Sequence, residues 1–157
     1  EAKFAVRVGS NSLIMDSGGA GKYRGGLGIE QVVQARTNVV LNTQIDRVHC
    51  KPWGLNGGED AAGNSVALRL EGEWKEDFPN AKVLTAQLKD GEAFRLRSGG
   101  GGGFGPAQER PANKVAADVQ QGYVSVKVAE QAYGVVVDKD TLELNQAETQ
   151  KRRGEMS

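Results

Sequence analysis

The residues that most resemble a binding motif are a glycine and a lysine in a glycine-rich loop, Gly21 and Lys22. A loop that binds the phosphates of a nucleotide has the spacing Gly-x-x-x-x-Gly-Lys-Ser/Thr, in which backbone N–H groups surround the phosphates and the hydroxyl reaches the metal. Here Tyr23 follows the lysine, and Asp16 stands where the first glycine belongs. The dinucleotide pattern Gly-x-Gly-x-x-Gly also fails, because Arg24 occupies its last position. The loop therefore does not predict a phosphate site.

His49 and Cys50 are the only histidine and the only cysteine. Zinc usually needs three or four protein ligands, which these two residues cannot supply. A cysteine nucleophile needs a base within reach, but neighbouring residues on a strand point to opposite faces. We expect structural or incidental roles for both, and the alternative is that His49 contributes to a site shared with another chain.

The remaining polar and aromatic candidates have simpler interpretations. Four carboxylates lie in turn-like segments, where solvated or turn-forming roles are commonest: Glu59, Asp60, Asp77 and Asp90. We expect Trp53 and Trp74 to be packing anchors, because no basic or aromatic array surrounds them. The basic run at residues 151–153 is expected to be a solvated helix end. No catalytic, cofactor-binding or metal-binding residue is assigned from these patterns.

Composition excludes partners that are recruited by charge. The chain has 157 residues, with 20 basic and 20 acidic side chains and a formal net charge of zero, which predicts no attraction to nucleic acid or to an anionic membrane. A single cysteine rules out a disulfide framework and favours the cytoplasm. No apolar run approaches the roughly 20 residues that a membrane helix requires. The chain opens on Glu1 in an alternating pattern, so we expect that it was cut from a longer protein or that the numbering begins inside one.

Alternation of apolar and polar residues predicts strands in the first two thirds of the chain. The expected strands are residues 4–8, two between 29 and 50 with a turn near 36–38, 65–71, 82–89 and 92–97. Asn11 and Ser12 are expected to turn the chain after the first strand. Residues 29–50 are expected to form one hairpin, and the Asp-Gly pair at Asp90 and Gly91 predicts a second.

The last third predicts helices. The first begins at Pro111 and is capped by Gly122, and the second runs from Ser125 to Tyr133. A short strand is expected at residues 135–137, and a capping box that starts at Asp140 predicts a final helix through residue 153. The fold class is therefore α+β with a mainly β core. We expect a β-rich core with glycine loops over residues 1–110 and a helical extension of the same domain over residues 111–157.

Glycine is the compositional outlier. There are 22 glycines, about twice the usual share of roughly 7%. They gather in three segments, residues 16–28, 51–58 and 99–105. By composition alone, residues 99–103 predict a flexible linker.

Together these segments resemble the C-terminal part of the B-type subunit in the hydantoinase B/oxoprolinase family, which is related to acetone and acetophenone carboxylase subunits. The resemblance continues through Glu109-Arg110, Asp118-Val119, residues 122–125, Ala129 and residues 133–136. It departs from the family where Gly105-Pro106-Ala107-Gln108-Glu109-Arg110 replaces Gly-Asp-Pro-Leu-Glu-Arg, and where Asn56 replaces a common phenylalanine. The missing aspartate puts any role of that turn in doubt.

The resemblance implies part of an ATP-dependent hydrolase of hydantoins, 5-oxoproline or lactams. It implies a hetero-oligomer of the remainder of the B-type subunit with an A-type, HyuA-like subunit that hydrolyses ATP. ATP and a divalent metal would be bound outside this chain, and the family's metal ligands lie upstream, so no site residue is carried over. Alternatives are a segment of a ketone carboxylase subunit and a non-catalytic scaffold. The resemblance also predicts that residues 99–103 are ordered and packed in a polyproline-II-like conformation.

Overall fold

The computed structural model describes residues 3–156, which form two compact units. The sheet unit consists of the residues up to Leu13, Gly28–Lys51 and Gly63–Gly99. The glycine unit consists of Ile14–Leu27, Pro52–Ala62 and the chain from Gly100 onward. The described residues form seven strands and three α-helices, which confirms an α+β fold that is mostly sheet. Among them, no helix is long and apolar enough to cross a membrane.

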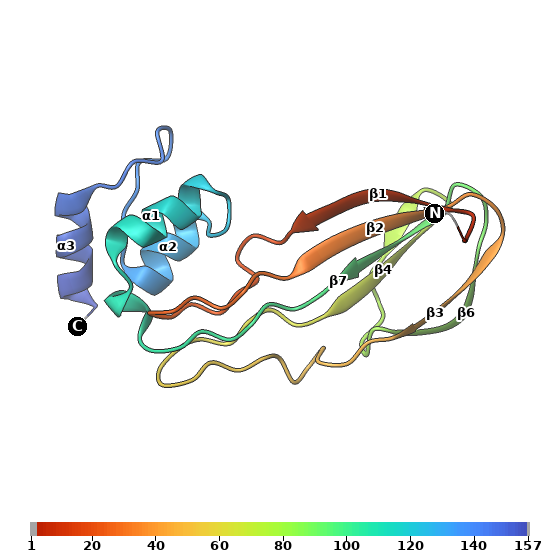
Figure 1. Ribbon diagram of the computed structural model, residues 1–157, viewed down its shortest axis with the longest axis horizontal. Coiled ribbons are helices and arrows are strands. Elements are labelled where there is room, and N and C mark those ends of the chain that lie inside the picture. The colour runs from red at the N-terminus through yellow and green to blue at the C-terminus, as the bar shows by residue number, and fades with distance from the viewer. Residues whose placement is uncertain (1–2, 157) are drawn as a thin grey trace. The chain divides into compact units, whose positions relative to one another are not determined.

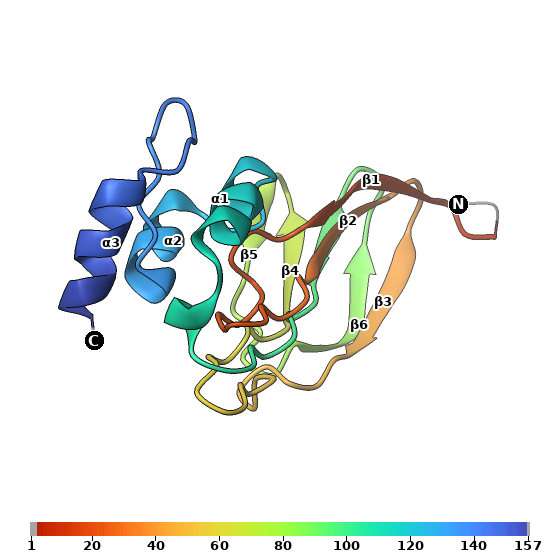
Figure 2. The same cartoon turned by 60° about the vertical axis from the view of Figure 1, so that its left-hand side comes forward.

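The sheet unit contains two antiparallel sheets (Figure 1). The larger sheet has the order β1-β2-β7-β4-β5, and its strands are β1 (Val6–Leu13), β2 (Ile29–Ala35), β7 (Ala93–Arg97), β4 (Ser65–Leu70) and β5 (Glu73–Lys75). The smaller sheet pairs β3 (Val39–Gln44) with β6 (Lys82–Leu88), as Figure 2 shows. Phe94 on β7 lies opposite Val33 on one side and Leu68 on the other, which fixes the register at the centre of the larger sheet.

Both expected hairpins are wrong, although their strands are present. The turn at residues 36–38 leads from β2 in the larger sheet to β3 in the smaller one, and the turn at Gly91 leads back from β6 to β7. The two connections are held together, because the Ala35 N–H donates to the Glu92 oxygen at 2.8 Å and the Gly91 N–H donates to the Ala35 oxygen at 3.0 Å. The Asp-Gly signal therefore identified a reversal of the chain but not the pairing partner of either strand.

The core of the sheet unit lies between its two sheets. Its buried members are Val66, Leu68, Ala81 and Val83, which come from both β4 and β6 and their connections. Thr43 lies at an irregularity in the β3–β6 pairing, where its hydroxyl donates to the Ala81 oxygen and accepts from the Val83 N–H, each at 2.9 Å. The hydroxyl therefore satisfies backbone groups that would otherwise be buried without a partner.

Three smaller expectations need correction. Asn11 and Ser12 do not form a turn but lie inside β1, where they pair with Gln31 and Glu30. The strand expected over 65–71 ends at Leu70, and a turn leads into β5. Residues 135–137 form no strand, because only an isolated bridge joins Val137 to Leu144.

The glycine unit contains the helices: a 3-10 turn η1 (Ala107–Glu109), α1 (Ala112–Gln120), α2 (Val126–Tyr133) and α3 (Gln146–Glu155). The predicted caps of α2 are confirmed, because the Ser125 hydroxyl accepts from the Val128 N–H at 3.2 Å and Gly134 ends the helix with a φ of 61°. The start predicted for α3 is wrong. Asp138 forms a local turn with the N–H groups of Asp140 and Thr141, and Asn145 caps the helix instead.

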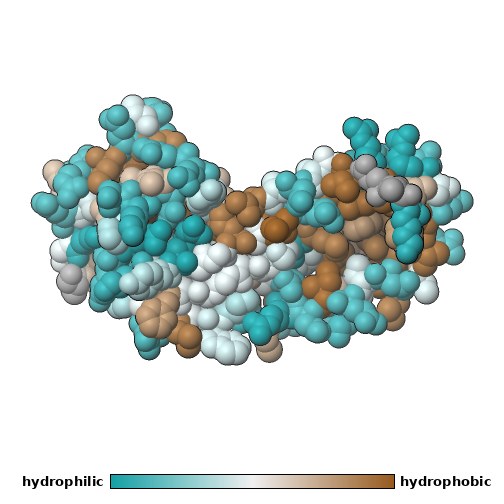
Figure 3. All heavy atoms as spheres, in the orientation of Figure 1, coloured by the Kyte–Doolittle hydropathy of each residue, from teal (hydrophilic) through white to brown (hydrophobic). Residues whose placement is uncertain are grey.

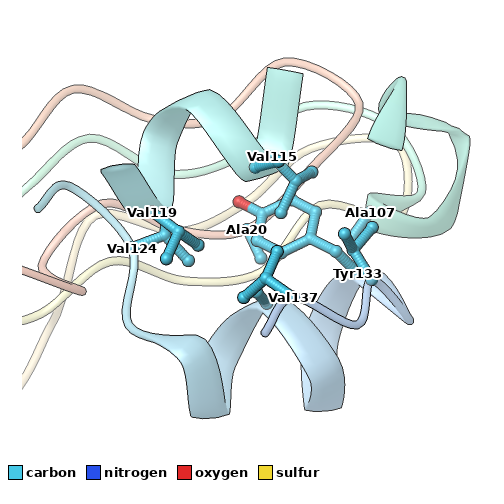
Figure 4. Close-up of a cluster of buried hydrophobic side chains, with 10 residues drawn as sticks. Ala20, Ala107, Val115, Val119, Val124, Tyr133 and Val137 are labelled. Atoms are coloured by element: carbon cyan, nitrogen blue, oxygen red, sulfur yellow. The ribbon is translucent and has the colours of Figure 1, made fainter. Parts of the chain in front are cut away.

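The helical core is the cluster of buried apolar side chains inside the glycine unit (Figure 4). Val115 and Val119 of α1 pack with Tyr133 of α2, and Val135 and Val137 follow from the next segment. Ala20 and Ala107 are small buried members of the same cluster. Since Ala20 belongs to the first glycine-rich segment, the helices and that segment share one core.

The three glycine-rich segments pack backbone against backbone. Gly101 accepts from the Gly19 N–H and donates to the Gly26 oxygen, each at 2.9 Å, while the Gly103 N–H donates to the Glu59 oxygen at the same distance. A Cβ on Gly25 or Gly103 would overlap a neighbouring backbone, so these glycines are required by close approach. Residues 99–103 are therefore not a flexible linker. Their polyproline-II-like conformation remains a prediction.

The expected organisation, with a β-rich core over residues 1–110 and a helical extension over residues 111–157, also remains a prediction. We propose instead a description by the two compact units. The chain passes between them after residues 13, 27, 51, 62 and 99. The helices after residue 110 belong to the same unit as the glycine-rich segments.

Candidate functional site

The backbone N–H groups of the first glycine-rich segment are engaged within the protein. Those of Lys22 and Tyr23 donate to the oxygens of Gly105 and Phe104 at 3.2 and 3.0 Å. The Gly25 N–H donates to the Gly19 oxygen at 3.0 Å. A phosphate-binding loop needs such groups to converge on open space, which this segment does not offer.

Lys22 is also committed to a partner. Its Nζ lies 2.8 Å from Glu109 Oε2, and this hydrogen-bonded ion pair raises the pKa of the lysine. Both side chains are about half exposed. The pair therefore resembles a surface tether between the first glycine-rich segment and η1 more than a phosphate-binding lysine.

His49 and Cys50 are exposed in the sheet unit and line a shallow cavity of about 170 Å³ with Asp46, Arg47 and Lys82. Within residues 3–156, no group of three or more His, Cys, Asp and Glu side chains is arranged to hold a metal ion. The structure brings no second candidate ligand set to this histidine, so the hypothesis of a site shared with another chain remains a prediction.

The tryptophans differ from the expectation of two packing anchors. Trp53 is 64% exposed, so it does not anchor a core within this chain. Trp74 is 37% exposed and lies against the guanidinium of Arg95, whose central carbon is 4.8 Å from the ring centroid. Asp60 acts as a turn former, because its Oδ1 accepts from the Gly54 N–H at 3.0 Å.

A largely buried ionic cluster, which the sequence patterns did not single out, joins Arg24, Arg110 and Asp118. Asp118 Oδ2 accepts from Arg110 Nη2 at 2.9 Å and from Arg24 Nε at 3.3 Å. The three side chains are only 11 to 16% exposed. Arg24 Nη1 also donates to the Gly25 oxygen at 2.8 Å. A single carboxylate on α1 thus holds the first glycine-rich segment and the segment that follows η1.

Further hydrogen bonds extend this cluster to α3. Arg110 Nη1 donates to the Lys22 oxygen at 3.2 Å, and Arg153 Nη2 donates to the Arg110 oxygen at 2.7 Å. Arg153 Nε reaches the Tyr133 oxygen at 3.1 Å. We call the three ionic residues together with Arg153 the arginine lock, because they connect the glycine-rich segments to all three helices.

The chemistry of the arginine lock is that of a structural support. Guanidinium groups neither donate nor accept protons at ordinary pH, and the carboxylate is already shared by two of them. Burial raises the pKa of the neighbouring Tyr133 phenol, which keeps it protonated. A charged residue inside a glycine-rich segment, such as Arg24, was the only sequence signal that could have pointed to this cluster.

Solved structures define the class of fold. The chain superposes on nucleotide-free acetone carboxylase, from a study of ATP-dependent acetone carboxylation, with a TM-score of 0.81 and 25% identity over 97% of this chain and 25% of that chain. It superposes on the ATP-dependent caprolactamase from Pseudomonas jessenii with a TM-score of 0.82 and 26% identity over 98% of this chain and 27% of that chain. The fold is thus that of one part of a much longer enzyme chain.

A family model described as hydantoinase B/oxoprolinase matches residues 1–107. The chain belongs to the hydantoinase B/oxoprolinase family, as its glycine-rich segments indicated. It is similar to the beta subunit of the caprolactamase of Pseudomonas jessenii, with 31% identity over 98% of this chain and 27% of the relative. It is also 28% identical to the B-type subunit of a D-/L-hydantoinase from a Pseudomonas strain, over 98% of this chain and 26% of the relative. The chain therefore spans about a quarter of the length of these relatives.

Proposed function

We propose that this chain is the C-terminal part of a B-type subunit in an ATP-dependent cyclic-amide hydrolase. The observation that carries the proposal is the match of almost the whole chain, in sequence and in fold, to the caprolactamase of Pseudomonas jessenii. A similarity to the 5-oxoprolinase of Saccharomyces cerevisiae, with 32% identity over 67% of this chain, supports the same class. Opening of a cyclic amide is the reaction that these names share.

The part that this chain plays in the enzyme is to support the site and not to supply its reacting groups. The described residues offer no nucleophile with an adjacent base, and their donor set does not fit a nucleotide or a divalent metal. We propose that ATP and the metal bind to the remainder of the B-type subunit and to an A-type subunit that hydrolyses ATP. The whole hetero-oligomer would act in the cytoplasm.

A ketone carboxylase is the second candidate, and a specific observation favours it. The fold of acetone carboxylase matches this chain almost as closely as that of caprolactamase, with TM-scores of 0.81 and 0.82. A third hypothesis is a scaffold that assembles the complex without affecting turnover. The three differ in what the complex converts and in whether it needs this chain.

Reconstitution of the complex separates these hypotheses. The remainder of the B-type subunit and the A-type subunit are combined with or without this chain and given caprolactam, hydantoin, 5-oxoproline, or acetone with bicarbonate. Under the proposal, one cyclic amide stimulates phosphate release from ATP and its ring opens, but only when the chain is present. Stimulation by acetone alone would establish the carboxylase. Equal turnover without the chain would contradict both enzyme hypotheses.

A further inference from the structure

Three large apolar side chains lie in a row on the surface of the glycine unit. Phe104 forms an antiparallel bridge with Tyr23 and a parallel bridge with Leu55, so it stands between them. Residues directly opposite each other in such bridges carry their side chains on the same face. The ring centroids of Tyr23 and Phe104 are 6.2 Å apart, in agreement with this placement. We call these three side chains the apolar row.

The apolar row is exposed although it lies on a rigid frame. Tyr23 is 64% exposed, Leu55 56% and Phe104 45%. Tyr23 and Phe104 exchange both backbone hydrogen bonds at 3.0 Å. The Leu55 N–H donates to the Gly103 oxygen, and the Leu55 oxygen accepts from the Gly105 N–H, each at 2.9 Å. Ordering these side chains against a partner therefore requires no rearrangement of the backbone that carries them.

The two faces of this frame differ in kind. Gly103 and Gly105 flank Phe104 and are buried, and a Cβ on Gly103 would overlap the backbone of Ala20. The inner face is thus filled by backbone, while the outer face presents two aromatic rings and a leucine. In Figure 3 the pale glycine-rich segments are bordered by brown, apolar side chains. Single exposed apolar residues are ordinary, but contiguous ones, aromatic above all, mark an interface.

Charge and chain length indicate what covers the row. The charged groups of Lys22 and Glu109, on its flank, pair with each other, so the row offers no net charge to an acidic or basic partner. All three row residues lie in the portion matched by the family model, residues 1–107. The relatives that contain the equivalent of almost this whole chain are nearly four times as long. About three quarters of such a subunit must pack somewhere, and an apolar, uncharged surface suits a permanent contact.

We propose that the apolar row of Tyr23, Leu55 and Phe104 is the surface on which the remainder of the B-type subunit packs. This inference rests on the proposed function, because it presumes a longer B-type subunit. It assigns to the glycine-rich segments a purpose beyond their own close packing, which is to hold the row flat and rigid against another part of the same subunit.

Photo-crosslinking tests the contact directly. The complete B-type subunit is prepared with p-benzoylphenylalanine in place of Phe104 and is irradiated together with the A-type subunit, without substrate or ATP. We expect crosslinks that mass spectrometry maps to the same polypeptide, outside this chain. Leu84, which is 69% exposed on β6, is the matched control and should give at least about tenfold fewer of them. Crosslinks to a second copy or to the A-type subunit, or none above the control, would overturn the proposal.

Substitution gives a second, independent measurement. Phe104→Ser removes the central ring but leaves the backbone bridges in place. We expect the thermal midpoint of the 157-residue chain alone to stay nearly unchanged, while that of the complete subunit falls, and Leu84→Ser should lower neither. An equal fall in both proteins would show that Phe104 serves only the fold of this chain. Neither experiment measures turnover, so an inactive complex with the expected crosslinks would contradict the proposed function and leave the contact standing.

Discussion

At the scale of single residues, Asp118 has the largest expected effect on stability. It is the only carboxylate that contacts Arg24 and Arg110 among the described residues, and all three side chains are withdrawn from water. A buried ion pair need not stabilise a fold relative to an apolar replacement, but removing one partner leaves the other charge buried without compensation. Here two guanidinium groups would lose the same carboxylate at once.

We therefore expect Asp118→Ala to lower the free energy of unfolding by about 3–5 kcal/mol. Urea denaturation followed by circular dichroism measures the change. The control is Glu109→Gln, which breaks the half-exposed pair with Lys22 and should have little effect, because water already solvates both groups. Equal effects of the two substitutions would show that burial of the arginine lock does not matter.

Asp138 provides a prediction on pH dependence. The backbone N–H groups of Thr141 and Asp140 donate to its carboxylate and hold its pKa below the ordinary value of 3.8. A carboxylate with a lowered pKa in the folded state stabilises the fold above that ordinary value, and the contribution is lost as the pH falls through the lowered pKa. An NMR titration of the Asp138 carboxyl carbon should show the lowered pKa, and Asp138→Asn should remove this part of the acid sensitivity. A titration at or above 3.8 would show that the turn does not hold the carboxylate.

At the scale of elements, two adjacent glycines test whether close packing orders the glycine-rich segments. A Cβ on Gly25 would overlap the oxygen of Gly101, whereas a Cβ on Gly26 would meet nothing within 4 Å. Neither glycine has a positive φ. We expect Gly25→Ala to cost at least about 1–3 kcal/mol through overpacking, the order of magnitude found in protein cores. Gly26→Ala should be neutral or stabilising by roughly 0.4–1 kcal/mol, because alanine restricts the unfolded chain. Thermal unfolding of both variants makes the comparison, and equal midpoints would mean that the segments are loosely packed.

The limits of prediction from sequence are also visible at this scale. Alternation and caps depend on neighbours along the chain, so the strands and the start of α2 at Ser125 were predicted correctly. Strand pairing depends on which sheet buries each apolar face, and the local Asp-Gly turn at Gly91 contains no information about that choice. For the same reason, residues 99–103 resembled a linker by composition. Only the backbones of Gly19, Gly26 and Glu59, distant in the sequence, show why these glycines are ordered.

The candidate site was harder to predict than the fold. The arginine lock joins residues separated by up to 94 positions within its ionic cluster, and no spacing rule connects them. Arg24 alone was conspicuous, as a charge within a glycine-rich segment. The apolar row could not be predicted, because the common face of Tyr23 and Phe104 follows from a bridge between distant segments.

At the scale of the whole molecule, the order of the chain and the order of its units do not coincide. The first, second and third glycine-rich segments are each separated in sequence by strands of the sheet unit. No single cut can therefore divide the chain into its two units. Ala20, in the first glycine-rich segment, packs with Val115 and Tyr133, which lie about a hundred residues later. The glycine unit depends on both ends of the described chain.

This interleaving predicts how a truncated chain behaves. A fragment of residues 1–110 keeps every strand but loses α1, α2 and α3, and with them most of the helical core. We expect its strand amides to remain protected from hydrogen exchange, since the core between the two sheets is intact. The amides of Gly19, Gly101 and Gly103 should exchange far faster than in the full chain, because the helices no longer anchor their segments through Ala20 and Arg24. Adding residues 111–157 as a separate peptide should restore part of this protection. Unchanged protection of the three glycine amides in the fragment would show instead that the glycine-rich segments hold together without the helices and that residue 110 is a true domain boundary.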